Sequence, residues 1–111
     1  MEKNKNIDFM AIGDIVIDAF IKLKEAEIEY ENGVKMLEMR FGEKLPYDSV
    51  KVVKAVGNAP NASVSAARLG LNSAVMTHVG DDDFGKECLD SLKDKEVITD
   101  YITVENGKTT N

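Results

Sequence analysis

The dipeptide Asn32-Gly33 is the sequence feature that most constrains the fold, because it separates two runs of alternating apolar and charged residues. Such alternation is typical of a strand with one apolar face, and Asn-Gly readily adopts the positive φ angles of a type I′ turn. We therefore predict a β-hairpin, followed by a loop over Phe41–Tyr47 and a further strand over Val50–Val56. The residues expected to form one apolar face are Ile21, Leu23, Ile28, Tyr30, Val34, Met36 and Leu37.

The segments on either side of this all-β region predict alternating strands and helices. Ile7–Ile17 is rich in β-branched and apolar residues, which indicates a strand buried on both faces, and Gly13 marks a bend near its end. Small residues at helical spacing predict a helix over Ala59–Leu69 that stops before Gly70, and Ser73–Val79 predicts a second buried strand. This order favours an α/β fold with a parallel sheet.

A second helix is predicted from the acidic run Asp81–Asp83, which supplies an N-cap, to about Glu96. Its apolar face contains Phe84, Cys88, Leu89 and Leu92. A short strand over Tyr101–Val104 and a turn at Asn106-Gly107 follow. The acidic run also raises the alternative of a metal site, but adjacent carboxylates rarely converge without further ligands, so we assign no metal ligand. His78 has no partner suggested by spacing, and we expect a core or surface residue.

Composition narrows the class of partner. The chain of 111 residues has 20 acidic against 14 basic residues, a formal net charge of -6, which disfavours nucleic acid and anionic membranes as partners. No stretch approaches the roughly 18 apolar residues of a transmembrane helix, and the charged N-terminus lacks a signal-peptide core. The single cysteine, Cys88, cannot form an intramolecular disulfide. We therefore expect a cytoplasmic location.

The segment Val56–Gly80 contains the residues best suited to bind a ligand. Gly57 allows a ligand to approach bare backbone, and the side chains of Asn58 and Asn61 each donate and accept hydrogen bonds. The start of the predicted helix adds unpaired N–H groups. Such a surface suits a polyhydroxyl ligand, and the alternative is an ordinary capped helix with asparagine turns.

This segment resembles the first signature of the PfkB, or ribokinase-like, family of sugar kinases. The matching positions are Gly57, Ala59, Asn61, Ser63, Gly70 and Gly80. Val56 departs from the alanine or glycine that is usual there, and the run GDDDFG, residues 80–85, resembles a recurrent segment of the same family. The resemblance implies a partial ribokinase-like α/β/α sandwich with a protruding β-sheet lid. It also implies that residues 1–111 are the N-terminal part of a single kinase domain, with the lid inserted at about residues 20–56.

The run AIGDIVIDAF resembles the first strand of the family, in which an aspartate binds sugar hydroxyls, and by position this residue is Asp18. A carboxylate accepts two hydroxyl hydrogen bonds, and charge-assisted bonds are the stronger kind. Asp14 is the competing candidate, which we interpret as a turn or cap residue beside Gly13. The predicted substrate-binding residues are therefore Asp18, Gly57, Asn58 and Asn61.

The second signature of the family, with its anion hole and catalytic aspartate, has no counterpart in this sequence. We therefore assign no catalytic or ATP-binding residue and expect the chain alone to be inactive, since positioning and electrostatic stabilisation supply most of the rate of phosphoryl transfer. The resemblance implies that the intact protein is a transferase that uses ATP and Mg²⁺ to phosphorylate a hydroxyl group of a sugar or related polyol. It also implies that the lid covers the sugar, pairs with a second subunit in a homodimer, or both. The alternative function is a non-catalytic ligand-binding or lid-mediated dimerisation module.

Overall fold

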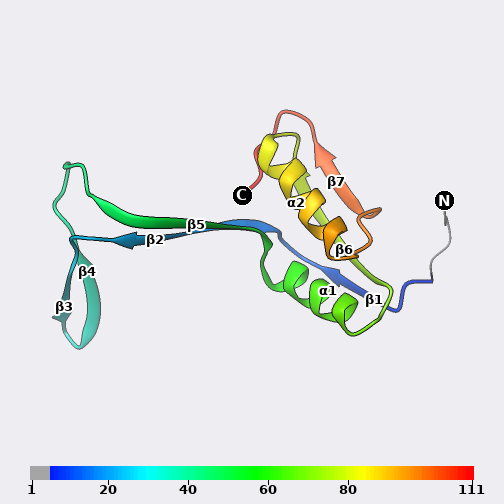
Figure 1. The fold of residues 1–111 in the computed structure, drawn as a ribbon, viewed down its shortest axis with the longest axis horizontal. Coiled ribbons are helices and arrows are strands. Elements are labelled where there is room, and N and C mark those ends of the chain that lie inside the picture. The colour runs from blue at the N-terminus through cyan, green and yellow to red at the C-terminus, as the bar shows by residue number, and fades with distance from the viewer. Residues whose placement is uncertain (1–5) are drawn as a thin grey trace. The chain divides into compact units, whose positions relative to one another are not determined.

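The structure is a computed structural model that describes residues 6–111. Its elements in chain order are strands β1 (Phe9–Ile12), β2 (Val16–Leu23), β3 (Glu27–Glu31), β4 (Val34–Glu38) and β5 (Tyr47–Val56), helix α1 (Asn58–Arg68), strand β6 (Ser73–Gly80), helix α2 (Asp83–Asp94) and strand β7 (Ile102–Glu105) (Figure 1). The chain divides into two compact units. The first contains the residues up to Asp18 together with Val53–Asn111, and the second contains Ala19–Val52.

A three-stranded parallel sheet, in the order β1-β6-β7, is the frame of the first unit. Val75 and Val79 of the central strand β6 lie on the same face, because successive side chains of a strand alternate. The core cluster joins them to Val64 of α1 and to Cys88 and Leu92 of α2. Both helices therefore pack on one face of this sheet, which makes the first unit a layered α/β structure.

Helix α1 ends at Arg68, just before Gly70, the glycine that the sequence predicted to follow the helix. The amide of Gly70 donates to the carbonyl oxygen of Ala67 (3.0 Å), and the amide of Leu71 donates to the carbonyl oxygen of Ala66 (3.2 Å). These two bonds form a Schellman motif, in which Gly70 has a φ of 89°. The next strand, β6, matches the predicted second buried strand to within one residue.

The predicted strand over Ile7–Ile17 is divided into β1 and β2 at residues 13–15, which confirms the predicted bend at Gly13. Within this break, Ile15 turns into the core and is only 2% exposed. The predicted burial on both faces is wrong, because Ile12 is 72% exposed. The topology explains this exposure: Ala11 packs against the core beneath the helices, whereas its neighbour Ile12 points to the opposite face of an edge strand.

Strands β3 and β4 of the second unit form the predicted hairpin. Asn32 and Gly33 have φ angles of 50° and 79°, the two positive values that a type I′ turn requires. Glu31 lies opposite Val34 at the turn, and Glu27 lies opposite Glu38 at the far end. The Asn-Gly dipeptide therefore determined both the turn and the register.

The register corrects the predicted apolar face. Ile28 lies opposite Leu37, and these two residues share a face with Tyr30. Val34 and Met36 each lie opposite a glutamate of β3, so they belong to the other face. The prediction failed because alternation within β4 already places Leu37 on the face opposite to Val34 and Met36, and the register set by the turn then joins Leu37 to Ile28.

Helix α2 begins at the predicted acidic run, with Asp82 as its N-cap. Its buried residues are Gly85, Cys88 and Leu92, which confirms Cys88 as a core residue. Phe84, predicted to be buried, is instead 49% exposed. The reason is that Gly85 faces β6 at a separation too small to admit a Cβ atom, which turns Phe84 away from the sheet.

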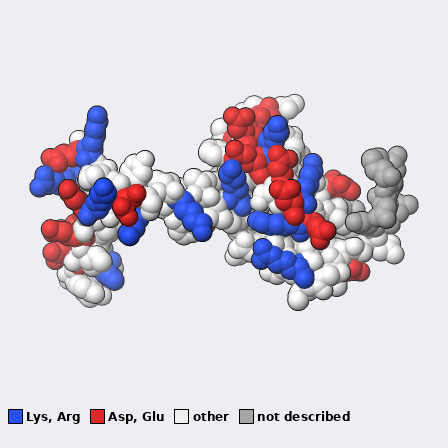
Figure 2. All heavy atoms as spheres, viewed as in Figure 1, with Lys and Arg blue, Asp and Glu red and all other residues white. Residues whose placement is uncertain are grey.

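Charged side chains of both signs are distributed over both units. On the face drawn in Figure 2, Lys and Arg lie next to Asp and Glu, as expected for a surface that water solvates. Among the described residues, neither helix has the length and the apolar character that crossing a membrane requires.

Candidate functional site

The start of α1 meets the backbone that follows β1. Gly57, the N-cap of α1, has φ 120° and ψ 170°, a region that only glycine readily occupies. A Cβ atom on Gly57 would lie 3.0 Å from the backbone carbonyl oxygen of Asp14. A Cβ atom on Gly13 would similarly lie 3.1 Å from the Cβ atom of Ala59. Two glycines therefore allow the loop after β1 and the start of α1 to approach each other closely.

The predicted residues Asn58 and Asn61 lie on this helix start and are both exposed. Residues three positions apart are neighbours on a helix surface, so the two amide side chains share one side of α1. No side chain of residues 6–111 caps the first amides of the helix. These amides sit at the positive end of the helix dipole. The structure thus brings Gly57, Asn58 and Asn61 together, and the group combines backbone donors with neutral donors and acceptors.

The fourth predicted residue, Asp18, is exposed on β2. Its neighbour Ile17 packs against the core, so alternation directs the Asp18 carboxylate to the other side of the strand. β2 pairs with β5, and β5 leads directly into Gly57. The competing residue Asp14 is also exposed, and its backbone carbonyl is the group that a Cβ atom on Gly57 would meet. Both carboxylates are therefore accessible to a ligand.

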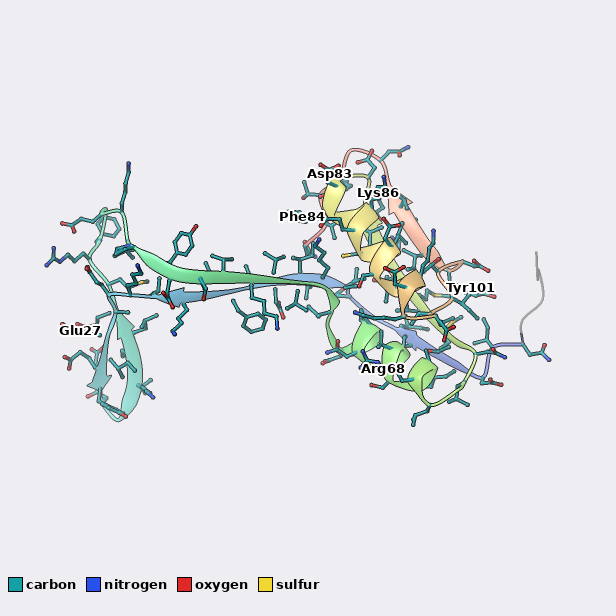
Figure 3. All side chains as sticks on the ribbon, viewed as in Figure 1. Glu27, Arg68, Asp83, Phe84, Lys86 and Tyr101 are labelled. Atoms are coloured by element: carbon teal, nitrogen blue, oxygen red, sulfur yellow. The ribbon has the colours of Figure 1, made fainter. Side chains whose placement is uncertain are left out.

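The carboxylate of Asp82 binds two separate elements. Its Oδ1 accepts hydrogen bonds from the amide of Gly85 (2.9 Å) and the hydroxyl of Thr110 (2.6 Å), and its Oδ2 accepts from the amide of Thr110 (2.9 Å). These bonds, chiefly that from the Thr110 hydroxyl, hold the pKa of the Asp82 carboxyl below its ordinary value. Asp81 accepts from the amide of Gly107 (3.0 Å), whereas Asp83 is exposed (Figure 3). The run predicted to cap a helix thus also anchors residues 107–110, which its sequence did not indicate.

His78 has a carboxylate partner that sequence spacing did not reveal. Its Nδ1 lies 2.8 Å from Oε1 of Glu105 on the neighbouring strand β7. The side chains of this pair are 66% and 45% exposed, so the pair contributes little to stability. The remaining reactive side chain, Cys88, is buried, and its burial raises the pKa of the thiol.

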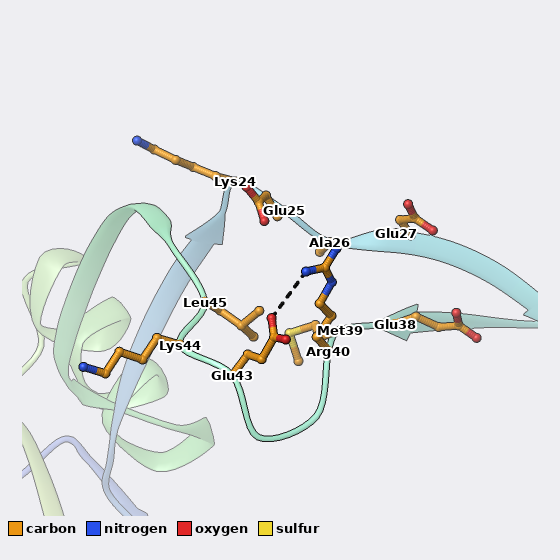
Figure 4. A pocket seen from close by; sticks show the side chains of 10 residues that line it. All are labelled: Lys24, Glu25, Ala26, Glu27, Glu38, Met39, Arg40, Glu43, Lys44 and Leu45. Carbon is orange, nitrogen blue, oxygen red and sulfur yellow. Dashed lines mark hydrogen bonds and ion pairs between the residues drawn. The ribbon is translucent and has the colours of Figure 1, made fainter.

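An open hollow of about 580 Å³ lies in the second unit, lined by residues 24–27, 38–40 and 43–45 (Figure 4). Most of its lining residues are charged, and Nη1 of Arg40 lies 3.4 Å from Oε2 of Glu43. None of the four predicted substrate residues lines this hollow. Among residues 6–111, no group of three or more His, Cys, Asp or Glu side chains is placed to hold a metal ion. The start of α1, where uncapped backbone amides lie next to the amide side chains of Asn58 and Asn61, is the candidate site.

Sequence comparisons match the chain to one protein family, and structural comparison matches its fold. A family model described as pfkB family carbohydrate kinase matches residues 9–111. The chain is 35% identical to the ribokinase of Dictyostelium discoideum over 65 residues, which cover 59% of the chain and 20% of the relative. It is 28% identical to the bifunctional protein HldE of Campylobacter fetus over 102 residues, which cover 92% of the chain and 20% of the relative.

Among solved structures, Arabidopsis thaliana ribokinase complexed with ribose and ATP matches with a TM-score of 0.73 at 19% identity. The match covers 92% of the chain and 29% of the Arabidopsis protein. It confirms the predicted fold class, a partial ribokinase-like α/β domain. The chain spans about 20% of the length of the two curated relatives described above.

Proposed function

Because the chain belongs to the pfkB family of carbohydrate kinases, we propose that it is the N-terminal, substrate-binding part of an ATP-dependent kinase that phosphorylates a hydroxyl group of a sugar or related polyol. The observation that carries this proposal is the start of α1, where Gly57, Asn58 and Asn61 lie together with uncapped backbone amides. The family match over nearly the whole chain supports the same reaction class.

Each proposed substrate residue has a distinct role. Gly57 lets the backbone at Asp14 lie against the helix start, and the uncapped amides there bind sugar hydroxyls. Asn58 and Asn61 donate to and accept from hydroxyl groups, whose two-sided hydrogen bonding suits an amide. Asp18 accepts hydrogen bonds from two hydroxyl groups and fixes the orientation of the sugar.

The phosphoryl group comes from ATP, with Mg²⁺ as the accompanying cation, and we assign neither to a residue of this chain. The catalytic base and the anion hole lie outside residues 1–111 in this proposal, and the chain alone is inactive. We place the protein in the cytoplasm, which the single, buried and unpaired thiol of Cys88 supports.

The test is a substrate panel applied to the full-length protein. D-Ribose, D-fructose, D-glucose, adenosine and myo-inositol are each supplied with ATP and Mg²⁺, and ATP consumption is measured. At least one compound is expected to stimulate ATP consumption, and the isolated 111-residue chain is expected to consume none. A full-length protein that phosphorylates no sugar or polyol contradicts the proposal.

The role of Asp18 is tested with a matched variant. Asp18→Ala removes a charged hydrogen-bonding group worth about 1.5–3 kcal/mol, so kcat/KM for the sugar is expected to fall roughly 10- to 150-fold. Asp14→Ala removes the same group from an exposed position four residues earlier and leaves the backbone carbonyl next to Gly57 in place. An unchanged kcat/KM for Asp18→Ala would remove Asp18 from its proposed role, and a loss confined to Asp14→Ala would assign that role to Asp14.

A second candidate function, lid-mediated dimerisation, is favoured by the hairpin of the second unit. Ile28, Tyr30 and Leu37 share one face and are 56%, 70% and 58% exposed. An apolar face of this kind is typical of a surface that another protein surface covers. Light scattering of the full-length protein is expected to show a dimer that Tyr30→Lys converts to a monomer. A wild-type monomer at all concentrations contradicts this function.

A further inference from the structure

The hydroxyl of Thr110 links two residues of the GDDDFG run, Gly80 and Asp82. It accepts a hydrogen bond from the amide of Gly80 (3.0 Å) and donates one to Oδ1 of Asp82 (2.6 Å). The hydroxyl therefore accepts from the amide of a buried residue, Gly80, and donates to the half-buried carboxylate of Asp82. Valine has the same shape but can neither accept nor donate a hydrogen bond, so the site requires a hydroxyl at this position.

The same segment reaches the strand that carries the candidate substrate carboxylate. The residue after Thr110 is Asn111, and its carbonyl oxygen accepts a hydrogen bond from the amide of Ile17 (2.9 Å). Ile17 directly precedes Asp18 in β2. An unbroken path of hydrogen bonds and covalent bonds therefore runs from Asp82 through Thr110 to the backbone beside Asp18.

We propose that Asp82 and Thr110 are positioning residues for Asp18. Asp82 holds both the amide and the hydroxyl of Thr110, which fixes the backbone of the segment in two directions. The segment in turn fixes the amide of Ile17. The inference rests on the proposed function, because it assumes that Asp18 binds the sugar. It adds that the acidic run sets the orientation of that carboxylate as well as capping a helix.

The experiment compares Thr110→Val with Thr110→Ser in the full-length protein. The substrate is the panel compound with the highest kcat/KM. Loss of the hydroxyl is expected to raise KM for this compound roughly tenfold or more, because small displacements of a substrate-binding group are costly, while KM for ATP stays unchanged. The serine variant retains the hydroxyl and is expected to lie within about twofold of wild type.

A second pair of variants tests the carboxylate. Asp82→Asn retains the size of the side chain but leaves only one accepting oxygen for three donors, the amides of Gly85 and Thr110 and the hydroxyl of Thr110. Asp83→Asn is the control, because it removes the same charge from an exposed neighbouring residue (Figure 3). Only Asp82→Asn is expected to raise KM. If either variant acts through Asp18, it is expected to have no further effect on KM in an Asp18→Ala background.

Outcomes that overturn the inference are distinct from those that overturn the proposed function. If no panel compound is phosphorylated, the proposed function fails. If Asp18→Ala raises KM but Thr110→Val and Asp82→Asn lower only the melting temperature, the two residues are merely structural and the inference alone fails. Should both variants fail to fold, hydrogen exchange of the wild-type Ile17 amide decides: sugar binding is expected to slow it, and an unchanged rate overturns the inference.

Discussion

The conformation of Gly57 gives a sharp prediction for Gly57→Ala. Its φ of 120° and ψ of 170° lie where a residue with a Cβ atom is strained by about 1–3 kcal/mol. The added Cβ atom would also lie 3.0 Å from the carbonyl oxygen of Asp14, which is backbone and cannot rotate away. Relieving that contact adds about 1 kcal/mol. We therefore expect the free energy of unfolding to fall by about 2–4 kcal/mol in total.

Gly70→Ala is the matched control for this prediction. Gly70 also has a positive φ, 89°, but a Cβ atom there meets no atom within 4 Å. Only the conformational cost remains, about 1 kcal/mol. Urea denaturation of full-length wild-type protein and both variants measures the difference. If Gly57→Ala is no more destabilising than Gly70→Ala, the close approach of the Asp14 backbone does not constrain this site and the reasoning is refuted.

Three further predictions concern the rest of the first unit. A Cβ atom on Gly80 would overlap the backbone of Lys108, because it would lie 2.8 Å from the carbonyl carbon. Gly80→Ala is therefore expected to lower the free energy of unfolding, measured by urea denaturation, by more than about 3 kcal/mol. A decrease below about 1 kcal/mol contradicts this packing. The thiol of Cys88 is buried with a raised pKa, so it is expected to react with a thiol reagent at pH 8 only as fast as the protein opens, and rapid modification of native protein contradicts its burial. The pKa of the Asp82 carboxyl is held below 3.8 mainly by the hydrogen bond from the Thr110 hydroxyl. The ionised carboxylate therefore stabilises the folded protein above pH 3.8, and this stabilisation is lost as the pH falls through the lower pKa of the folded state. An NMR titration midpoint at or above 3.8 contradicts these hydrogen bonds.

Elements that depend on local chemistry were predictable from the sequence. The turn at Asn32-Gly33 needs two positive φ angles, and few dipeptides supply them, so the sequence signal was specific. The end of α1 at Gly70 and the cap of α2 at Asp82 are likewise set by single residues acting within one turn. In each case the structure follows from contacts between residues fewer than six positions apart.

Features that depend on pairing between distant segments were not predictable. Ile12 belongs to an apolar run, yet its exposure is decided by the position of β1 at the edge of the sheet and by the side on which the helices pack. The partner of His78 lies 27 residues later on β7, and nothing in the local sequence indicates that pairing. Hydrophobic pattern indicates that a face is apolar, but tertiary contacts decide whether it is covered.

The residues of the candidate site differ in the same way: local motifs were predictable, and residues that act through distant contacts were not. Gly57, Asn58 and Asn61 lie within five residues of one another, so a compact motif was sufficient to bring them together. Thr110 had no such signal, because its importance comes from one hydroxyl shared between the end of β6 and the start of α2. The role of this threonine is evident only from the structure, which shows its hydroxyl bonded to both Gly80 and Asp82. Residues that position a binding group are therefore harder to predict from sequence than the binding group itself. Their effect depends on hydrogen bonds to backbone segments that are distant in the sequence.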